Sequence, residues 1–349
     1  LWHRFPTCAA PVENRCHKTV GRGRFMSERV FLIDGLSQIF RCYYAPFRAL
    51  TSPSGEPTRA TYVFTNMLLQ LIREQKPDFL VMVMDSAEAP VFRKSVDAAY
   101  KAHREAPPED LAPQIQRILE IIRSQDVPIL SVPGYEADDL LATIACKLAD
   151  TDVDVLMVSK DKDLDQVLTD RVKLFDPAKG EIIGPAELGQ LKGYSPARAV
   201  EVQTLCGDST DNVPGVKGVG PKKAAALIAK YGTADNTIAH ADELTPAMRE
   251  NVKAFANQVA ITRELVTLRC DVPIDFDLAR CRWTGLKSDR LYPIFKELGF
   301  SRLADQFADS ASTAPLPKTG ETKRPARPQW ADDAPLFAQS EPGSVNPVQ

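Results

Sequence analysis

Acidic residues stand where several apolar, strand-like runs of this chain end. VFLID ends at Asp34, FLVMVMD ends at Asp85, and VDVLMVSKD ends at Asp161. A buried carboxylate costs several kcal/mol unless it is paired or binds a cation. A fold that gathers such residues at one edge of a sheet therefore needs cations there. The carboxylates that could contribute are Asp34, Asp85, Glu136, Asp138, Asp139, Asp161, Asp163, Asp208 and Asp211.

The apolar runs alternate with longer amphipathic stretches. This alternation predicts an α/β fold, with a central, mostly parallel sheet flanked by helices. In such a sheet, ligands bind beyond the carboxyl ends of the strands, where Asp34, Asp85 and Asp161 are expected. The expected strands are residues 30–33, 79–84, 128–132, 153–158 and 172–175, and the expected helices are 59–74, 113–124 and 138–149.

Composition limits the class of protein. The 349 residues suffice for one large or two ordinary domains. The net charge of −3 gives no overall basic field, so any surface for nucleic acid must come from local clusters. Seven cysteines without short regular spacing do not describe a disulfide framework and suit a reducing cytoplasm. No run approaches the roughly 18 apolar residues of a membrane-spanning helix, so no membrane contact is expected.

Changes in composition divide the chain into four parts. Residues 1–25 precede MSERVFLIDG and are expected to be a disordered or mis-assigned extension, and their Cys8, Cys16 and His17 lack the second ligand pair of a zinc finger. A catalytic domain is expected over 26–204, and a helical, Gly/Pro-punctuated subdomain over 205–308. The Pro-rich residues 309–349 are expected to be a disordered tail.

Two motifs carry most of the acids. In GYEADDLLATIA, Glu136 and Asp139 lie about 60° apart around a helix, so with Asp138 they can direct oxygens at one point. Acids at a helix N-terminus also stabilise the helix by ~0.3–1 kcal/mol each, so a purely structural role stays open. In SKDKDLDQVL, Asp161 and Asp163 can present two oxygens to a metal, or simply form a charged turn.

This concentration of carboxylates predicts a chemistry. Mg²⁺ takes carboxylate and water oxygens as ligands. Two such ions about 4 Å apart can clamp the attacking and leaving oxygens of a phosphodiester. The residues alone therefore indicate a nuclease.

Two basic segments could hold nucleic acid. GVKGVGPKKAAAL places a glycine turn before a helix, which can contact phosphates through its backbone, or can be a plain packing element. FRKSVDAAYKAHRE mixes cations with an aromatic ring, as single-strand binding sites do, although a solvated helix would read the same way. The candidate residues are Gly215, Lys217, Gly218, Gly220, Lys222 and Lys223 in the first segment, and Arg93, Lys94, Tyr100, Lys101 and Arg104 in the second.

Taken together, these motifs resemble the flap endonuclease family, and within it the 5′-3′ exonuclease domain of bacterial DNA polymerase I. The resemblance runs in order from about residue 26 to 307. It rests on FLIDGLSQIFRCYYA, TSPSGEPTRATYVF, PDFLVMVMDS, FRKSVDAAYKAHREAPPEDL, VPGYEADDLLATIA, SKDKDLDQVL and LCGDSTDNVPGVKGVGPKKAAALI.

The resemblance implies a PIN-like flap-nuclease fold with a helix-three-turn-helix DNA-binding subdomain. It implies two Mg²⁺ or Mn²⁺ ions, and a K⁺ ion at the glycine turn. It also implies a helical arch at about residues 86–110, with Tyr100, Lys101 and Arg104 beside the scissile phosphate and Arg93 and Lys94 at basic positions. The implied first metal set is Asp34, Asp85, Glu136 and Asp138, with Asp139 nearby or acting through water, and the second is Asp161, Asp163, Asp208 and Asp211.

The implied partners are branched or nicked duplex DNA with 5′ ends or flaps, and a DNA polymerase. We expect a monomer in the bacterial cytoplasm, associated with the nucleoid. Leu336 and Phe337 suggest a sliding-clamp contact only weakly, because the Gln of such peptides is missing. Two other functions stay open: a non-catalytic binder of branched DNA, and a metal-dependent RNase. Retaining so many acids without metal would be destabilising, and a simple RNase would not require the glycine turn.

Overall fold

The fold is built on a six-stranded sheet. The computed structural model describes residues 27–311 except 87 and 90. The strand order is β3-β2-β1-β4-β5-β6, in which β6 pairs antiparallel with β5 and the other neighbours are parallel. The strands are β1 (Glu28–Asp34), β2 (Phe79–Val83), β3 (Ile129–Leu130), β4 (Val153–Val158), β5 (Val172–Asp176) and β6 (Glu181–Ile183).

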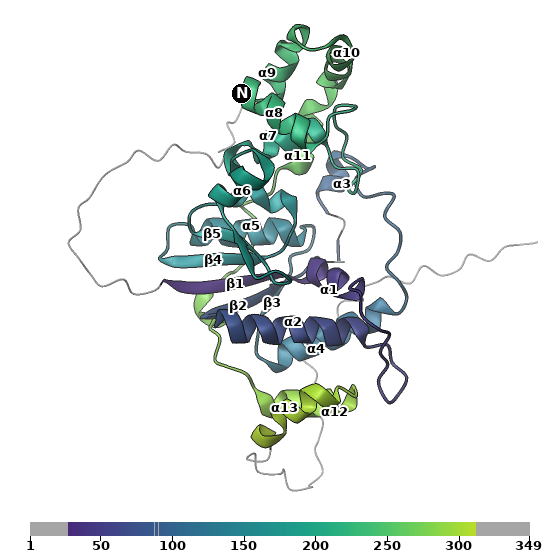
Figure 1. The fold of residues 1–349 in the computed structure, drawn as a ribbon, viewed down its shortest axis with the longest axis vertical. Coiled ribbons are helices and arrows are strands. Elements are labelled where there is room, and N and C mark those ends of the chain that lie inside the picture. The colour runs from purple at the N-terminus through teal and green to yellow at the C-terminus, as the bar shows by residue number, and fades with distance from the viewer. Residues whose placement is uncertain (1–26, 87, 90, 312–349) are drawn as a thin grey trace, which may run out of the picture.

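Alternate side chains of the central strands bury against helices on opposite faces of the sheet, which is why these runs are continuously apolar. Val30 and Leu32 face α5 (Ala137–Leu148). Phe31 and Ile33 face a second helical layer, which lies below the sheet in Figure 1. That second layer comprises α1 (Gly35–Tyr43), α2 (Arg59–Gln75) and α4 (Leu111–Ser124).

A helical region lies above the sheet and α5 in Figure 1, on the side away from α2 and α4. Its core is formed around Leu205, Ile228 and Phe255. The short helix α3 (Arg93–Val96) packs against α11. The elements of this part of the chain are the 3₁₀ helix η1 (Lys162–Val167), α6 (Pro185–Lys192), α7 (Pro196–Cys206), α8 (Pro221–Tyr231), α9 (Ala234–Ala239), η2 (Ala241–Glu243), α10 (Pro246–Phe255), η3 (Ala256–Gln258) and α11 (Val259–Val266).

The chain then returns to the sheet. After α11 it runs through η4 (Leu278–Cys281) to α12 (Ser288–Glu297) and α13 (Ser301–Ala311). Phe295 and Leu303 of this pair share a core with Leu69 of α2 and Ile121 of α4, and Figure 1 shows the two helices below that layer. Residues 288–308, which were expected in the helical subdomain, therefore pack against α2 and α4 instead.

The α/β class, the five expected strands and the three expected helices are confirmed. The sequence missed α1, which starts directly at the end of β1, and the edge strand β6. Helix α13 continues to Ala311, three residues into the expected tail. The remaining tail with Leu336 and Phe337, and residues 1–25 with Cys8, Cys16 and His17, lie outside the described residues. No helix in the described part of the chain is long and apolar enough to cross a membrane.

Candidate active site

The end of β1 places Asp34 at the carboxyl edge of the sheet. Its carboxylate caps α1 by accepting from the Ser37 backbone N–H at 3.3 Å, and it accepts from Ser159 Oγ, just beyond β4, at 2.7 Å. Burial, reinforced by the charges of Asp85 and Asp161, raises the pKa of Asp34 to about 7. The turn is tight: a Cβ on Gly35 would come within 2.9 Å of the Val83 carbonyl oxygen.

The N-terminus of α5 lies beside the end of β2. The Ala137 N–H donates to Asp85 Oδ1 at 3.0 Å, and burial raises the pKa of Asp85, with Glu136 adding to the effect. Glu136 is the N-cap of α5 and forms a reciprocal capping box with Asp139. The helix start thus directs this acidic motif toward the strand ends.

Asp138 is the residue on which the acidic groups converge. Burial raises its pKa well above the ordinary value, and the next four influences are the charges of Asp34, Asp161, Asp163 and Asp85, all in the same direction. Asp138 therefore lies within electrostatic reach of acids from β1, the end of β2 and the η1 turn.

A second acidic group comes from the η1 turn and the loop after α7. Asp161 caps η1 through the Asp163 N–H at 2.9 Å, while Asp163 accepts from Gln203 Nε2 at 2.6 Å. Burial and the charge of Asp161 raise the pKa of Asp163 to about 7, and Asp211 and Asp208 act in the same direction. Acids from motifs that are distant in the sequence thus lie close together at the carboxyl edge of the sheet, as the strand pattern predicted.

Three cations neutralise part of the cluster. Lys101 pairs with Glu136 and lies 3.5 Å from Asp211, and Arg104 pairs with the other oxygen of Asp211. Lys162 pairs with Asp208 at 2.9 Å. Burial by itself would raise the pKa of Asp208, but the contact with Lys162 lowers it.

These ion pairs occupy oxygens of Glu136, Asp208 and Asp211. As the side chains stand, no group of three or more His, Cys, Asp or Glu residues in the described ranges could hold a metal ion.

Arg93 was expected on a DNA-contacting surface, but its side chain is 2 % exposed. Its guanidinium bonds both oxygens of Asp139 and one oxygen of Glu136 at 2.7–2.8 Å, and also donates to the carbonyl oxygens of Leu265 and Thr267. Burial alone would lower the pKa of Arg93, but these ion pairs raise it. In this arrangement Arg93 cannot reach a DNA strand, and it occupies the oxygens of Asp139.

Tyr100 is also buried, at 3 % exposure, so its ring is not available to stack on a base as the sequence suggested. It packs with Val213, Leu265 and Val266, and its hydroxyl donates to Glu136 at 2.9 Å. The expected arch at 86–110 contains one short helix, α3, followed by turns up to the start of α4. Lys94, in contrast, is exposed on this segment.

The glycine turn connects α7 to α8. The backbones at Gly207 and Gly215 pass very close to each other. A Cβ on either glycine would lie 2.5–2.7 Å from backbone atoms beside the other. Gly218 has a φ of +78°, and Gly220 is the N-cap of α8. Lys217, Lys222 and Lys223 are exposed around the turn. The carbonyl oxygens of Lys217 and Gly218 accept from Asn251 and Lys223, which leaves fewer oxygens for a K⁺ ion.

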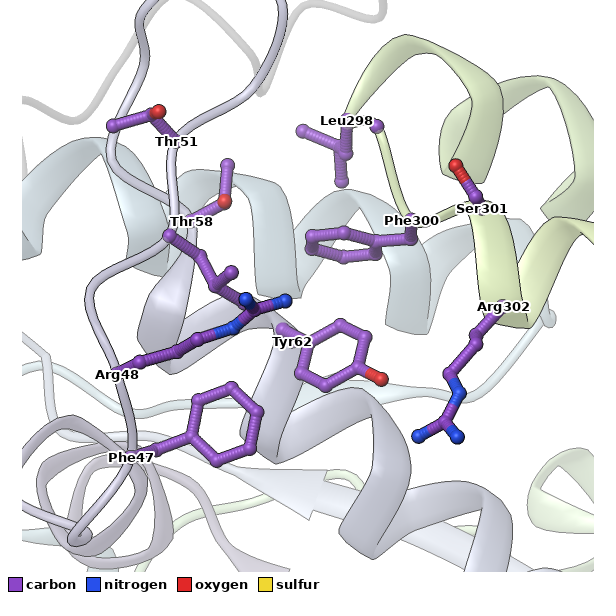
Figure 2. Close-up of a pocket in the computed structure, with 11 residues that line it drawn as sticks. Phe47, Arg48, Thr51, Thr58, Tyr62, Leu298, Phe300, Ser301 and Arg302 are labelled. Carbon is purple, nitrogen blue, oxygen red and sulfur yellow. The ribbon is translucent and has the colours of Figure 1, made fainter.

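A separate cavity of about 460 Å³ lies between the loop after α1 and the turn joining α12 to α13. Figure 2 shows the rings of Phe47, Tyr62 and Phe300 and the guanidinium groups of Arg48 and Arg302 around it. None of the candidate site residues lines this cavity. The acidic cluster and this cavity are therefore different features of the molecule.

Comparison with known families agrees with this geometry. Residues 29–193 match the 5′-3′ exonuclease N-terminal resolvase-like domain, and residues 194–289 match the 5′-3′ exonuclease C-terminal SAM fold. The chain belongs to the 5′-3′ exonuclease family. Within this nuclease family, the sheet and α5 form the resolvase-like part, and the helices from α7 to α11 form the SAM-like part.

Curated relatives include bacterial DNA polymerases I. The chain is 36% identical to that of Rhizobium leguminosarum over 291 residues, covering 81% of this chain and 28% of the relative. It is 35% identical to the thermostable DNA polymerase I of Thermus thermophilus over 314 residues, covering 87% of this chain and 37% of the relative. The chain thus spans about a third of the length of these relatives.

Solved structures show the same fold at lower identity. T5 5′-exonuclease with bound zinc ions matches with a TM-score of 0.56 at 20% identity, covering 81% of this chain and all of that one. The catalytic core of Rad2 in complex with a DNA substrate matches with a TM-score of 0.54 at 15% identity, covering 82% and 92% of the two chains. These likenesses confirm the expected fold.

The sequence missed three side chains that support the predicted acids. Ser159 contacts Asp34 and the Asp161 N–H, Lys162 contacts Asp208, and Gln203 contacts Asp163. Arg93 was predicted as a DNA contact, but the structure buries it against Glu136 and Asp139. Lys162 could have been found, because it stands between Asp161 and Asp163 in the DKD motif. Nothing in the sequence marks Gln203, which reaches the site from another helix.

Proposed function

We propose that this chain is a divalent-metal-dependent 5′-3′ exonuclease and structure-specific 5′-flap endonuclease that acts on DNA. The observation that carries the proposal is the convergence of acids from three other segments on Asp138, with Lys101 and Arg104 paired to the acids Glu136 and Asp211. Substrates with 5′ ends or flaps, and work beside a DNA polymerase, follow from the polymerase relatives and belong to the same proposal.

The donor chemistry fits a hard divalent cation such as Mg²⁺ or Mn²⁺. The pKa values of Asp34, Asp85, Asp138 and Asp163 are raised by burial and by the charges of neighbouring carboxylates, so a cation would relieve this repulsion. We propose Asp34, Asp85, Glu136 and Asp138 for one ion and Asp161, Asp163, Asp208 and Asp211 for the other. Asp139 is left out, because Arg93 and the Arg269 N–H occupy its oxygens.

Loading the ions would require Glu136, Asp208 and Asp211 to release Lys101, Lys162 and Arg104. When bound, the metals would supply a water of lowered pKa and stabilise the leaving oxygen of the phosphodiester. The released Lys101 and Arg104 could then hold the charge of the scissile phosphate. Lys101 and Arg104 would thus neutralise the acids before the metal ions bind, and the substrate phosphate afterwards.

Neighbouring polar residues would keep the ligands in place. Ser159 orients Asp34, Gln203 orients Asp163, and the Ala137 N–H orients Asp85. Such supporting hydrogen bonds commonly tune a metal site. The exposed Lys217, Lys222 and Lys223 around the glycine turn would grip the duplex backbone without reading bases.

The test is cleavage of a 5′-labelled flap duplex in Mg²⁺ and in EDTA, with a nicked duplex and a single-stranded RNA alongside. We expect a flap-length product that appears only with Mg²⁺ or Mn²⁺. Intact DNA in both metals, despite binding of the flap duplex, would refute the nuclease in favour of a non-catalytic binder. Cleavage of the RNA alone would favour the RNase.

A further inference from the structure

Two cysteines outside the acidic cluster lie next to each other, one in α5 and one in the segment that packs along α5. Cys146 lies near the C-terminal end of α5, and Cys270 lies in the segment that follows α11, 124 positions later in the chain. Their sulfur atoms are 2.7 Å apart, closer than unbonded sulfur atoms normally approach. Both residues are partly exposed, so small oxidants in solution can reach them.

The backbone around Cys270 is held against α5 on both sides. The Arg269 N–H donates to Asp139 at 2.9 Å, and the Arg269 carbonyl accepts from Thr143 Oγ1 at 3.2 Å. The Val272 N–H donates to the same hydroxyl at 3.2 Å. Since the residues flanking Cys270 are fixed to α5, the closeness of the two sulfur atoms follows from how the segment lies along the helix.

We propose that Cys146 and Cys270 are a modification site, a thiol pair that mild oxidants convert to a disulfide fastening residues 267–274 to α5. With hydrogen peroxide, one thiolate attacks the peroxide, forms an S–O bond and breaks the O–O bond, and the departing hydroxide takes a proton to become water. The second sulfur then displaces the hydroxyl as water and forms the S–S bond. In total, two thiols and one peroxide give one disulfide and two waters.

The other described cysteines are suited to serve as controls. Cys42 and Cys281 are buried, and burial raises the pKa of their thiols to about 12 and about 11, which keeps the reactive thiolate scarce. Cys206 is partly exposed like the pair, but its thiol donates to the Gly207 carbonyl. Reactivity of Cys146 and Cys270 therefore depends on their pairing, not on exposure alone.

The fastened segment has contacts beyond α5. The Thr267 carbonyl accepts from Arg93, and the Leu268 N–H donates to Gln166 of η1 at 3.0 Å. A disulfide at Cys270 would thus anchor a segment that also contacts α3 and η1. It would close a long loop, which stabilises a protein mainly by restricting its unfolded chain.

The test oxidises the full chain with hydrogen peroxide, alkylates the remaining thiols, and maps unreduced peptides by mass spectrometry. We expect the Cys146–Cys270 peptide pair in most molecules, 2 Da below the summed masses of the reduced peptides. We also expect a melting temperature raised by about 5 °C or more, which dithiothreitol reverses. The variant Cys206→Ser should keep both effects, and Cys146→Ser should lose both.

Separate alkylation of Cys146 and Cys270 in folded, oxidised wild-type protein would overturn the proposal, even if a serine variant fails to fold. A linked pair whose formation leaves the melting temperature unchanged would contradict the fastening of the segment. Neither result depends on nuclease activity, so this proposal can fail independently of the proposed function.

Discussion

Lys101 is the residue whose chemistry the structure defines most sharply. It pairs with Glu136 and Asp211, and it has a φ of +54°, a left-handed conformation that costs free energy in a non-glycine residue. Its backbone N–H is fixed to the Asp211 carbonyl at 2.9 Å. Strained positions of this kind cluster at functional sites, which agrees with a role beside the substrate.

Replacing Lys101 tests that role. We expect Lys101→Ala to lower kcat by about 10²-fold, because an electrostatic contact to the phosphate would be lost. Single-turnover cleavage of the flap duplex measures this effect. Lys94→Ala, on the exposed side of the same segment, is the matched control, and an equal loss in both variants would show that Lys101 has no special position.

The raised pKa values of the acids predict how stability depends on pH and metal. Asp34 and Asp163 have pKa values of about 7 when folded, against 3.8 in the ordinary state. Between these values the folded chain binds more protons than the unfolded one, so stability of the metal-free protein should fall as pH rises from about 4 to 7.

Melting curves at pH 5 and pH 8, in EDTA and in Mg²⁺, check this dependence. We expect Mg²⁺ to raise the melting temperature at pH 8 and to have little effect at pH 5, where the acids are protonated. An equal effect of Mg²⁺ at both pH values would contradict the assigned ligands.

Among the elements, α3, α5 and α11 are joined by one buried side chain. Arg93 bonds acids of α5 and the carbonyl oxygen of Leu265 in α11. Removing one partner of a buried ion pair leaves the other charge uncompensated and typically costs about 3–5 kcal/mol. Arg93 therefore links the start of α5 to the helical region.

We expect Arg93→Met to lower the free energy of unfolding by about 3–5 kcal/mol in chemical denaturation. The control is Arg171→Met, whose partners Asp152 and Asp154 are both accessible to solvent, with an expected change below about 1 kcal/mol. A loss for Arg93→Met as small as that of the control would contradict the tether.

The close backbone approach in the glycine turn predicts how a substitution at Gly215 changes stability. In Gly215→Ala, the new Cβ would lie 2.5 Å from the backbone of Cys206 and Gly207. We expect a loss of about 1–3 kcal/mol, because neither backbone segment can move freely. Gly189→Ala in α6 meets nothing within 4 Å and should be neutral or slightly stabilising. Equal melting temperatures for the two variants would refute the close approach.

For the whole molecule, alternation of apolar runs and amphipathic stretches was enough to predict the α/β class and all five parallel strands. It failed at β6, a three-residue edge strand with an exposed Ile182, since too little of it is buried to leave a pattern. It also failed at α1, which begins at Gly35, directly after β1 ends at Asp34.

In the candidate site, too, some features were predictable from the sequence and others were not. The positions of Asp34, Asp85 and Asp161 were predictable, because strand ends in a parallel sheet share an edge. The partners of Arg93 and Tyr100 were not, since they depend on how α3 and the turns after it pack against α5 and α11. Sequence spacing indicates which residues share an element, but burial of a charged or aromatic side chain depends on the assembled fold.

The central claim is that the converging acids bind the metals of a nuclease, and one measurement tests it directly. Asp161→Asn, wild type and the surface control Asp242→Asn are compared for binding and for Mg²⁺-dependent cleavage of the same labelled flap duplex. The account predicts that Asp161→Asn binds the duplex nearly as well as wild type but does not cut it, while Asp242→Asn does both. Full cleavage by Asp161→Asn would contradict the site.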